Sequence, residues 1–525
     1  MKISLDLCPI PVSKAGSNID EELLPFIAKT AGISEKDILG YSIERKSIDA
    51  RKKPHVNLNF RVIAEVSDHL QHTAMNHLQI VSENERQPRK RIRDAGTLRN
   101  PIVIGSGPAG LFAALTLAES GAEPIIFERG KDVDGRKKDI NLFRENGILN
   151  PESNYLFGEG GAGTWSDGKL FTRIHDPSVP YVLQEFVRAG ASPSISYFAH
   201  PHIGSDKLPE IVKNIRKRII SLGGRFLWNS CVSDIFLRNG VCRGVRLENG
   251  EMHEAPLVIA AVGHGARAFL ISLLRHEIPY QMKGFQLGVR IEHHQNWVNL
   301  CQYGMKKLPP CIGPAEYHLS SSPNAQTNGS ASFCMCPGGE IIAAVSEHEH
   351  LCTNGMSNSS RSGKFSNAAL IATIPATTFP SAQEAFSFLD AIERSFYAGG
   401  GGNWIAPAQY AIDFLHGTTH TIHEETSYHF GIKSARIDSM LPETIRTALQ
   451  RALFVYDKKM PQFIKSGLFI GVETHISLPF RFTRDVQTFQ SGIPGLFLCG
   501  EGAGMAGGIV SAAVDGMLCA EAIMH

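Results

Sequence analysis

Three short and wholly apolar runs mark the strands around which the chain is organised. They cover residues 102–104, 257–262 and 496–499, and each is followed by a turn that contains glycine. Such runs are typical of parallel strands that are buried on both faces of a sheet. The first and the last run lead into alanine-rich segments of helical length. We therefore expect two strand–turn–helix units, far apart in the sequence, that close on one sheet.

The turn after the first run carries the pattern of a dinucleotide site. Gly105, Gly107 and Gly110 complete G-x-G-x-x-G, Pro108 stands where a helix can begin, and Glu128 ends the next apolar run. The glycines permit a tight turn, a close approach of pyrophosphate and close packing of helix on strand, and the acid accepts hydrogen bonds from ribose. An ordinary βαβ turn is the alternative. It is disfavoured because strand, glycines, helix, second strand and acid are all in register.

Alternating apolar and polar positions predict a small α+β domain ahead of this unit. Residues 38–48 and 56–66 alternate like paired strands, and residues 19–30 are amphipathic with acids in the first turn, which indicates a helix. Basic residues cluster at 45–53 and again at 86–93. These clusters could dock RNA, an acidic protein or an anionic substrate. A solvated surface and linker is the favoured interpretation, because no aromatic platform accompanies the charges.

A glycine-rich segment at residues 154–173 is the second candidate for contact with a cofactor. Its glycines are interleaved with Thr164, Ser166, Asp167 and Lys169, a composition that gives close backbone approach and several donors. A flexible surface loop is the alternative. Trp165 and its apolar neighbours argue against that alternative, because they would anchor the loop in a core.

The middle of the chain reads as a meander followed by an insertion. Asn-Gly turns at 239–240 and 249–250 separate short strands, and the chain then returns to the sheet. From residue 285 to about 480 it resembles a substrate domain, in which the polar stretch 354–369 is expected to cover a cavity as a mobile loop. Cysteines and histidines at 334–352 lack a C-x-x-C pair, so no metal site is expected.

Composition narrows the range of partners. The formal net charge is +1 and the isoelectric point is about 7.7, so overall charge does not impose nucleic acid or a membrane as a partner. No apolar run is long enough to cross a bilayer, and residues 1–12 lack the apolar core of a signal peptide. The ten cysteines are scattered without a disulfide framework. A cytoplasmic protein with reduced thiols is expected.

Four stretches together resemble an uncharacterised family of FAD-dependent dehydrogenases within the glutathione-reductase-like flavoprotein superfamily. They are SIDARKK at 47–53, GEGGAGTWSDGKL at 158–170, CMCPGG at 334–339 and CGEGAGMAGGIVSAAVDG at 499–516. The resemblance implies that the first glycine turn and Glu128 hold the ADP half of FAD. It also implies that Gly500 and Glu501 meet the ribityl chain, with Glu501 standing where Asp is usual.

The expected fold class is α/β, with a Rossmann-like FAD-binding fold of the glutathione-reductase type, an inserted α+β substrate domain and a small N-terminal α+β domain. The expected boundaries are 1–95 for the N-terminal domain with its basic linker, 96–284 and 481–525 for the FAD-binding domain, and 285–480 for the insertion. The predicted cofactor-contacting residues are Gly105, Gly107, Pro108, Ala109, Gly110, Glu128, Arg129, Gly161, Gly163, Thr164, Ser166, Asp167, Val232, Gly263, Gly500, Glu501, Gly507, Gly508 and Ile509.

The predicted function is that of an oxidoreductase that acts on a small or lipid-like substrate through non-covalent FAD. Lys169, Arg290, Cys336 and His475 are the candidate catalytic residues. No second G-x-G-x-x-G with its strand, helix and acid occurs, so no dedicated domain for NADH or NADPH is expected. Electrons would come from a transiently bound NADH or NADPH, from the substrate itself or from an electron-transfer partner. The alternative is a flavin-bearing binding or redox-sensing protein whose basic N-terminal domain docks RNA or a protein.

Overall fold

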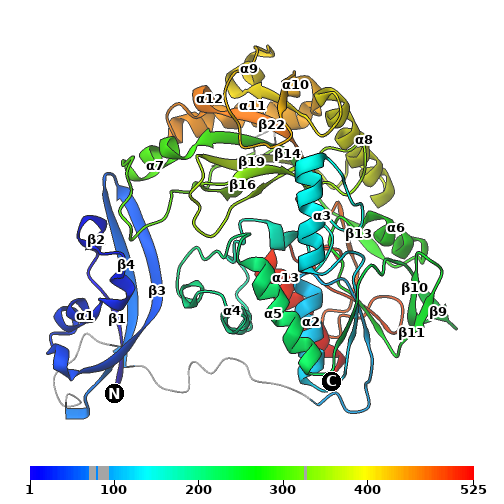
Figure 1. Cartoon of the computed structure of the whole chain (residues 1–525), viewed down its shortest axis with the longest axis horizontal. Coiled ribbons are helices and arrows are strands. Elements are labelled where there is room, and N and C mark those ends of the chain that lie inside the picture. Colours follow the sequence, from blue (N-terminus) through cyan, green and yellow to red (C-terminus); the bar gives the residue numbers. More distant parts are fainter. Residues whose placement is uncertain (70–78, 81–93, 324–327, 525) are drawn as a thin grey trace.

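The computed structural model describes residues 1–69, 79–80, 94–323 and 328–524, and it falls into three parts (Figure 1). We call them the N-terminal part, the parallel-sheet part and the inserted part. The basic cluster at 86–93 lies outside the described residues.

The parallel-sheet part contains the three apolar runs as neighbouring strands. Its sheet has the order β24-β12-β6-β7-β8, and every pairing in it is parallel. The strands are β6 (Ile102–Ile104), β7 (Ile125–Phe127), β8 (Arg225–Leu227), β12 (Val258–Ala260) and β24 (Leu496–Leu498). This arrangement confirms that the early and late strand–turn–helix units close on one sheet.

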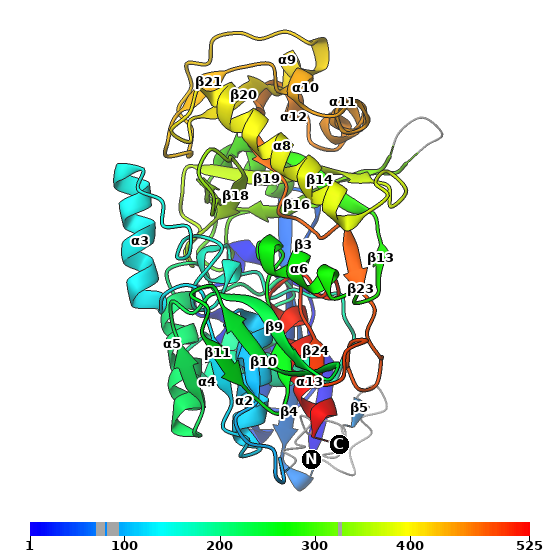
Figure 2. The same ribbon diagram turned by 90° about the vertical axis from the view of Figure 1, so that its right-hand side faces the viewer.

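Helices α2 (Pro108–Glu119) and α13 (Ile509–Ile523), which follow the first and last of these runs, pack against each other (Figure 2). Their close approach depends on Gly516, because a Cβ there would lie 2.0 Å from the carbonyl oxygen of Ala109. The remaining elements of this part are α3 (Val133–Asn146), α4 (Val179–Arg188), α5 (Leu208–Ser221), α6 (Arg267–Arg275) and the antiparallel meander β9 (Val232–Arg238), β10 (Val241–Leu247) and β11 (Met252–Glu254). Two distant segments thus form one helical layer on the sheet.

The inserted part is built on a seven-stranded sheet of order β15-β16-β19-β14-β22-β20-β21. The strands are β14 (Phe285–His294), β15 (Ser320–Ser321), β16 (Ser330–Cys336), β19 (Phe365–Ile374), β20 (Ala406–Tyr410), β21 (Ile432–Ser434) and β22 (Leu468–Glu473). Its helices are α7 (Gln295–Tyr303), α8 (Ala382–Gly400), α9 (Ala411–His416), α10 (Ile437–Met440), α11 (Glu443–Lys459) and α12 (Phe463–Ser466). The chain enters and leaves along β13 (Tyr280–Met282) and β23 (Phe480–Phe482), which pair antiparallel, so the two connections lie side by side (Figure 2).

The polar stretch 354–369 is a loop only at residues 357–364, so the prediction of a loop over its whole length is wrong, although Asn354, Gly355 and Arg361 do line the cavity described below. Its first residues belong to β18 (Thr353–Met356), which pairs with β17 (Glu340–Ala343), and its last residues form the start of β19. Ser366, Asn367 and Ala368 are fully buried in the middle of the sheet. Small polar side chains fit this tightly packed interior, so a polar composition here does not indicate exposure.

In its described residues, the N-terminal part is a five-stranded sheet with one α-helix. Its strands are β1 (Lys2–Asp6), β2 (Ile10–Pro11), β3 (Ile38–Lys52), β4 (His55–Val66) and β5 (Gln79–Ile80). The predicted pair of strands is confirmed as the antiparallel hairpin β3–β4. The helix predicted over 19–30 is a short turn at Ile19–Glu21 followed by α1 (Leu24–Ala31), because Pro25 restarts the helix at its first turn.

Some of the basic residues at 45–53 join the N-terminal part to the rest of the chain. The backbone of Lys46 donates to the carbonyl of Tyr197 at 2.8 Å and accepts from Ala199 at 2.9 Å, and its ammonium pairs with Asp20. Lys53 donates to the carbonyl of Cys301 in α7. These contacts give Lys46 and Lys53 a structural role in holding the three parts together.

Two chain-wide observations complete the fold. Among the described residues, no helix has the length and apolar character needed to cross a membrane. All ten cysteines lie within the described part of the chain, and each is a free thiol.

Candidate functional site

One large cavity lies between the parallel-sheet part and the inserted part. Its volume is about 1610 Å³, whereas a pocket for one drug-sized ligand occupies about 300–1,000 Å³. The wall includes the turn after β6, the glycine-rich segment and the start of α13 on one side, and β16 and the end of β22 on the other. The cavity therefore has room for a dinucleotide together with a second molecule.

The turn between β6 and α2 presents backbone to this cavity. Gly105 has φ +95°, and a Cβ there would lie 2.9 Å from the carbonyl oxygen of Ala261 in the neighbouring strand connection. At Gly107 a Cβ would meet nothing closer than 3.9 Å, so the space beside it is open to a ligand. Helix α2 begins directly afterwards at Pro108, and its N-terminus supplies a partial positive charge.

The carboxylate of Glu128 ties three segments of the site together. It accepts from the backbone N–H of Ser106 at 2.9 Å, from the Ser106 hydroxyl at 2.7 Å, and from the N–H groups of Gly130 and Gly158 at 2.9 and 3.0 Å. It is 5% exposed and lines the cavity. Glu128 thus fixes the glycine turn against the glycine-rich segment, in addition to any hydrogen bond to ribose.

Arg136, which the sequence analysis missed, holds the glycine-rich segment in place. This fully buried residue of α3 donates to the carbonyl oxygens of Asn154, Gly158, Glu159 and Gly161 at 2.7–3.2 Å. Its guanidinium lies 4.5 Å from the centre of the Trp165 ring. An arginine on the buried face of an amphipathic helix is the sequence signal that could have identified it.

Glu159, which lies inside the glycine-rich segment, should make the free energy of unfolding depend on pH. Burial raises the pKa of its carboxyl from 4.5 to about 7, although the N–H of Val133 and the charge of Arg216 oppose the shift. The stability that Glu159 contributes is therefore fully present below pH 4.5 and is lost as pH rises through 7. In Glu159→Gln this loss should disappear. The difference in unfolding free energy between wild type and variant should fall by roughly 3 kcal/mol between pH 4.5 and 8.

Urea unfolding of both proteins across this pH range checks the prediction. Arg216 keeps a partner in the variant, because it also pairs with Asp132 at 3.2 Å. A difference that stays constant from pH 4.5 to 8 would show that folding does not raise the pKa of Glu159.

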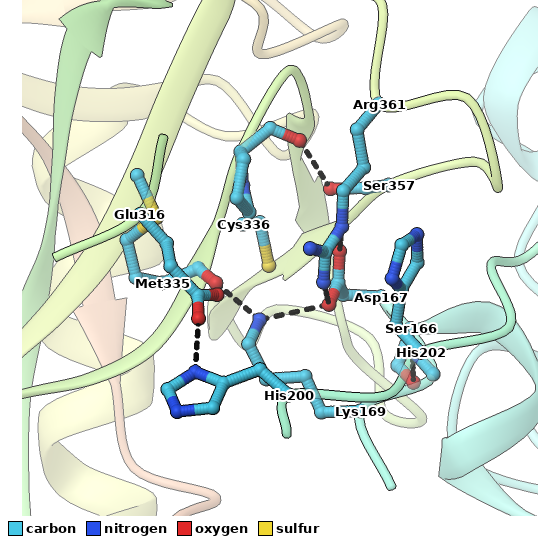
Figure 3. A network of polar contacts seen from close by, with 12 residues as sticks. Ser166, Asp167, Lys169, His200, His202, Glu316, Met335, Cys336, Ser357 and Arg361 are labelled. Carbon is cyan, nitrogen blue, oxygen red and sulfur yellow. Dashed lines mark hydrogen bonds and ion pairs between the residues drawn. The ribbon is translucent and has the colours of Figure 1, made fainter. Parts of the chain in front are cut away.

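On the side of the inserted part, two cations share the carboxylate of Asp167 (Figure 3). Lys169 lies 2.9 Å from it and also donates to the carbonyl of Met335, while Arg361 donates to both of its oxygens. Burial alone would raise the pKa of Asp167, but Lys169 and Arg361 lower it. The group is therefore a fixed ion cluster with one excess positive charge in the cavity wall.

A bulge in β16 shapes the same wall. The pairing with β19 shifts register between Phe333 and Cys336, and Cys334 has φ +42°, in the left-handed region that only glycine adopts freely. The bulge directs the carbonyl of Cys334 to Arg290 at 2.9 Å and the carbonyl of Met335 to Lys169. Strained backbone of this kind is concentrated at functional sites.

Arg290 lies behind the wall and does not line the cavity. It is fully buried, its Nε lies 2.6 Å from Glu473, and it donates to Asn354 at 2.6 Å. Glu473 does line the cavity. Burial raises the pKa of Glu473 to about 7, against the opposing charge of Arg290. Glu473, which the sequence analysis did not select, can therefore gain and lose a proton near neutral pH.

A second buried group surrounds His475. Its Nε2 lies 3.4 Å from Glu393, which also pairs with Arg267 at 2.6 Å. Burial lowers the pKa of His475 to about 4 despite Glu393, so the ring is neutral at neutral pH. The His475 and His264 rings are in edge contact, and His264 lies 2.8 Å from the Glu501 carboxylate. Two imidazoles thus connect the inserted part to the end of the parallel sheet.

The structure brings most of the sequence-selected residues to one cavity. Of the catalytic candidates, Lys169, Cys336 and His475 line it. Most of the cofactor candidates line it too, namely Gly105, Gly107, Pro108, Ala109, Glu128, Arg129, Gly161, Gly163, Ser166, Asp167, Val232, Gly263, Glu501, Gly507, Gly508 and Ile509. Gly110, Thr164 and Gly500 lie behind the wall, where Gly110 packs on the turn and Gly500 donates to Asp515 at 2.7 Å.

Three segments of the chain match models of known protein families or domains. Residues 284–476 match the family described as FAD-dependent protein, C-terminal domain-like, residues 100–138 match the FAD binding domain, and residues 10–65 match a domain of unknown function. An uncharacterised protein of Clostridium beijerinckii is 37% identical over 527 residues, which cover 98% of each chain.

Solved structures give a more distant likeness. A geranylgeranyl bacteriochlorophyll reductase-like protein of Thermoplasma acidophilum matches with 13% identity and a TM-score of 0.34, over 81% of this chain and 77% of that one. A flavin-dependent brominase matches with 13% identity and a TM-score of 0.37, over 82% and 79%. Scores this low carry no functional comparison.

Proposed function

Because this chain belongs to an uncharacterised family of FAD-dependent proteins, we propose that it is an oxidoreductase that works on a second molecule in the cavity described above. One observation carries the proposal. A single cavity joins a dinucleotide-type turn to a wall that contains Lys169, Glu473 and His475. A protein that merely stored a flavin would not need charged and titratable groups opposite the cofactor.

The residues present fit FAD. The open space beside Gly107 and the N-terminus of α2 suit a pyrophosphate, and Glu128 stands at the end of β7 where ribose hydroxyls are bound. Gly507, Gly508 and Ile509 bring the start of α13 to the same cavity. These features support binding of an extended dinucleotide between the two strand–turn–helix units.

Bound FAD supplies hydride or electron transfer. Lys169 places a positive charge in the wall, where it can hold an anionic group or stabilise negative charge that develops in the cavity. Glu473 can move a proton at its carboxylate near neutral pH, and Arg290 fixes the orientation of that carboxylate. The substrate class that we propose is a small or lipid-like molecule, because the cavity wall includes apolar side chains such as Phe171, Phe333 and Ile371.

Anaerobic mixing of the flavin-loaded protein with NADH or NADPH tests the proposal. Loss of the oxidised-flavin absorbance band within seconds is the expected result for an oxidoreductase that takes electrons from a transiently bound nicotinamide. Absence of bleaching with either nucleotide and with dithionite-reduced electron carriers would contradict the proposal.

Lys169→Met should separate binding of the cofactor from reaction. Asp167 keeps Arg361 as its partner in this variant, so the fold and the flavin content should be retained. Flavin reduction should slow by roughly 10²-fold, the usual effect of removing one charge-stabilising group. Stopped-flow absorbance measures the rate.

Lys433→Met is the matched control, because Lys433 is exposed and lies outside the cavity wall. Equal reduction rates in the two variants would exclude a role for Lys169 in the reaction.

A further inference from the structure

Three side chains of the types that bind metal ions lie together in the cavity wall, and the proposed function does not use them. They are His200, Glu316 and His318, and their ligand atoms all lie within 4.8 Å of one another. His200 pairs with Glu316 through Nδ1 (Figure 3), and Nε2 of His318 lies 3.7 Å from the same carboxylate oxygen. All three side chains line the cavity.

We propose that His200, Glu316 and His318 bind one divalent transition-metal ion of the Zn²⁺ class, with a coordination position left open toward the cavity. Two imidazoles and one carboxylate are a ligand set that suits Zn²⁺ and its first-row neighbours better than Ca²⁺ or Mg²⁺. Three protein ligands leave at least one position of the ion for water or another small ligand.

The local backbone places these side chains together from two directions. Glu316 and His318 are two positions apart on the segment that leads into β15, so an extended chain turns both side chains to the same side. His200 comes from the segment after α4 in the parallel-sheet part, and its ring also contacts Phe171 at 5.3 Å between centroids. A bound ion would therefore connect the parallel-sheet part to the inserted part.

Glu316 is prepared to act as a ligand. Its side chain is 19% exposed, and one of its carboxylate oxygens lies beside Nδ1 of His200 and 3.7 Å from Nε2 of His318. A carboxylate held beside two imidazoles is an arrangement that can bind a metal ion. The His200 and His318 rings lie 5.6 Å apart between centroids, and small side-chain rotations would bring their nitrogens to one ion.

The charges nearby permit a cation. Asp167 pairs with both Lys169 and Arg361, and Glu316 adds a second negative charge. With neutral imidazoles these four groups sum to zero. After an ion binds, the surplus positive charge favours an anionic group as the ligand that completes the coordination from the cavity.

Two other groups of possible ligands are weaker candidates among the described residues. In the group of Glu152, Cys231 and Glu248, the Glu152 carboxylate already accepts two hydrogen bonds from Arg129, and burial raises the pKa of the Cys231 thiol to about 12. In the other group, His350 is a single imidazole, and its partner Asp390 also pairs with Arg394. His200, Glu316 and His318 alone combine two imidazoles with a carboxylate that has no arginine or lysine bonded to it in the described structure.

Calorimetric titration with ZnCl₂ tests the proposal on the untagged, flavin-loaded full chain after treatment with a chelator. We expect one saturable site per chain. His200→Ala and His318→Ala should each weaken binding by at least about 10–100-fold, the loss that follows removal of even an outer partner of a metal site. Co²⁺ loading should give a ligand-field absorption that both variants lose.

His420→Ala is the matched control, because His420 is an exposed imidazole that pairs with one carboxylate, Asp413, without a second histidine in that pair. It should leave Zn²⁺ binding unchanged. Both site histidines are about half exposed, so their variants are expected to fold, and Glu316→Gln gives an independent check. Absence of a saturable site, or binding that is unchanged in all three site variants, would overturn the proposal. Neither result depends on flavin reduction, so the proposed function is tested separately.

Discussion

Gly110→Ala is expected to leave the chain unable to hold a flavin and to destabilise it by about 3 kcal/mol or more. A Cβ at this position would lie 1.9 Å from the carbonyl oxygen of Gly105 and 2.9 Å from its carbonyl carbon. These are backbone atoms of the cofactor turn and cannot rotate away, so α2 must move off β6. Overpacking against flexible side chains typically costs about 1–3 kcal/mol, and a backbone clash should lie at or above that range. Flavin absorbance per chain and urea unfolding measure the two effects.

Two further glycines provide the contrast. In Gly107→Ala the new methyl meets only the Cα of Gly161 at 3.9 Å, so the fold should be retained while the methyl fills the space proposed for pyrophosphate. Gly313→Ala places a methyl with nothing within 4 Å and should change neither property. Normal flavin content in Gly110→Ala would contradict the assignment of this turn, and normal content in Gly107→Ala would move the pyrophosphate elsewhere.

Arg136→Met should have the second large effect, although Arg136 is not in the cavity wall. The substitution preserves length and apolar volume but leaves the carbonyl oxygens of Asn154, Gly158, Glu159 and Gly161 without their common donor. Three of these carbonyls keep a second donor from Gly161 or Thr164, whereas that of Asn154 keeps none among the described residues. Because a hydrogen bond from a charged donor contributes about 1.5–3 kcal/mol, a loss of roughly 3–6 kcal/mol is expected where solvent and the remaining donors replace some of the bonds. The glycine-rich segment should also lose its conformation, and with it the affinity for flavin.

Arg129→Met is the control, because it shows what the loss of an arginine from this region costs when the four carbonyl bonds stay in place. Arg129 lines the cavity and donates twice to one carboxylate, that of Glu152, which is 38% exposed. Removal of a pair so accessible to solvent should cost about 1 kcal/mol or less. If Arg136→Met unfolds at the same urea concentration as Arg129→Met, the four carbonyl bonds do not hold the segment.

The sequence predicted the parallel sheet well because its signals are local. Apolar runs such as residues 102–104 are buried on both faces, and glycines follow them at fixed spacing, so strand, turn and helix could be recognised without tertiary information. The prediction for the stretch 354–369 failed because the deciding contacts are not local. Its polar residues Ser366 and Asn367 are buried by strands from elsewhere in the chain, which local composition does not reveal.

The candidate site divides in the same way. Lys169 stood out through its glycine-rich motif, His475 was selected as a candidate catalytic residue without one, and both line the cavity. Arg136 and Glu473 were not selected, because their roles depend on partners such as Gly161 and Arg290 that lie far away in the sequence. His200 and Glu316 lie more than a hundred residues apart in the sequence, and no motif of regular spacing connects them. The sequence therefore predicted no metal site there.

The central claim is that the two distant strand–turn–helix units, which end at α2 and α13, hold one FAD between them. The direct test is reconstitution of the purified full chain with excess FAD, followed by removal of free cofactor and measurement of flavin per chain. We expect one FAD per chain in the wild type and none in Gly107→Ala. A wild-type protein that remains colourless after reconstitution would contradict the account.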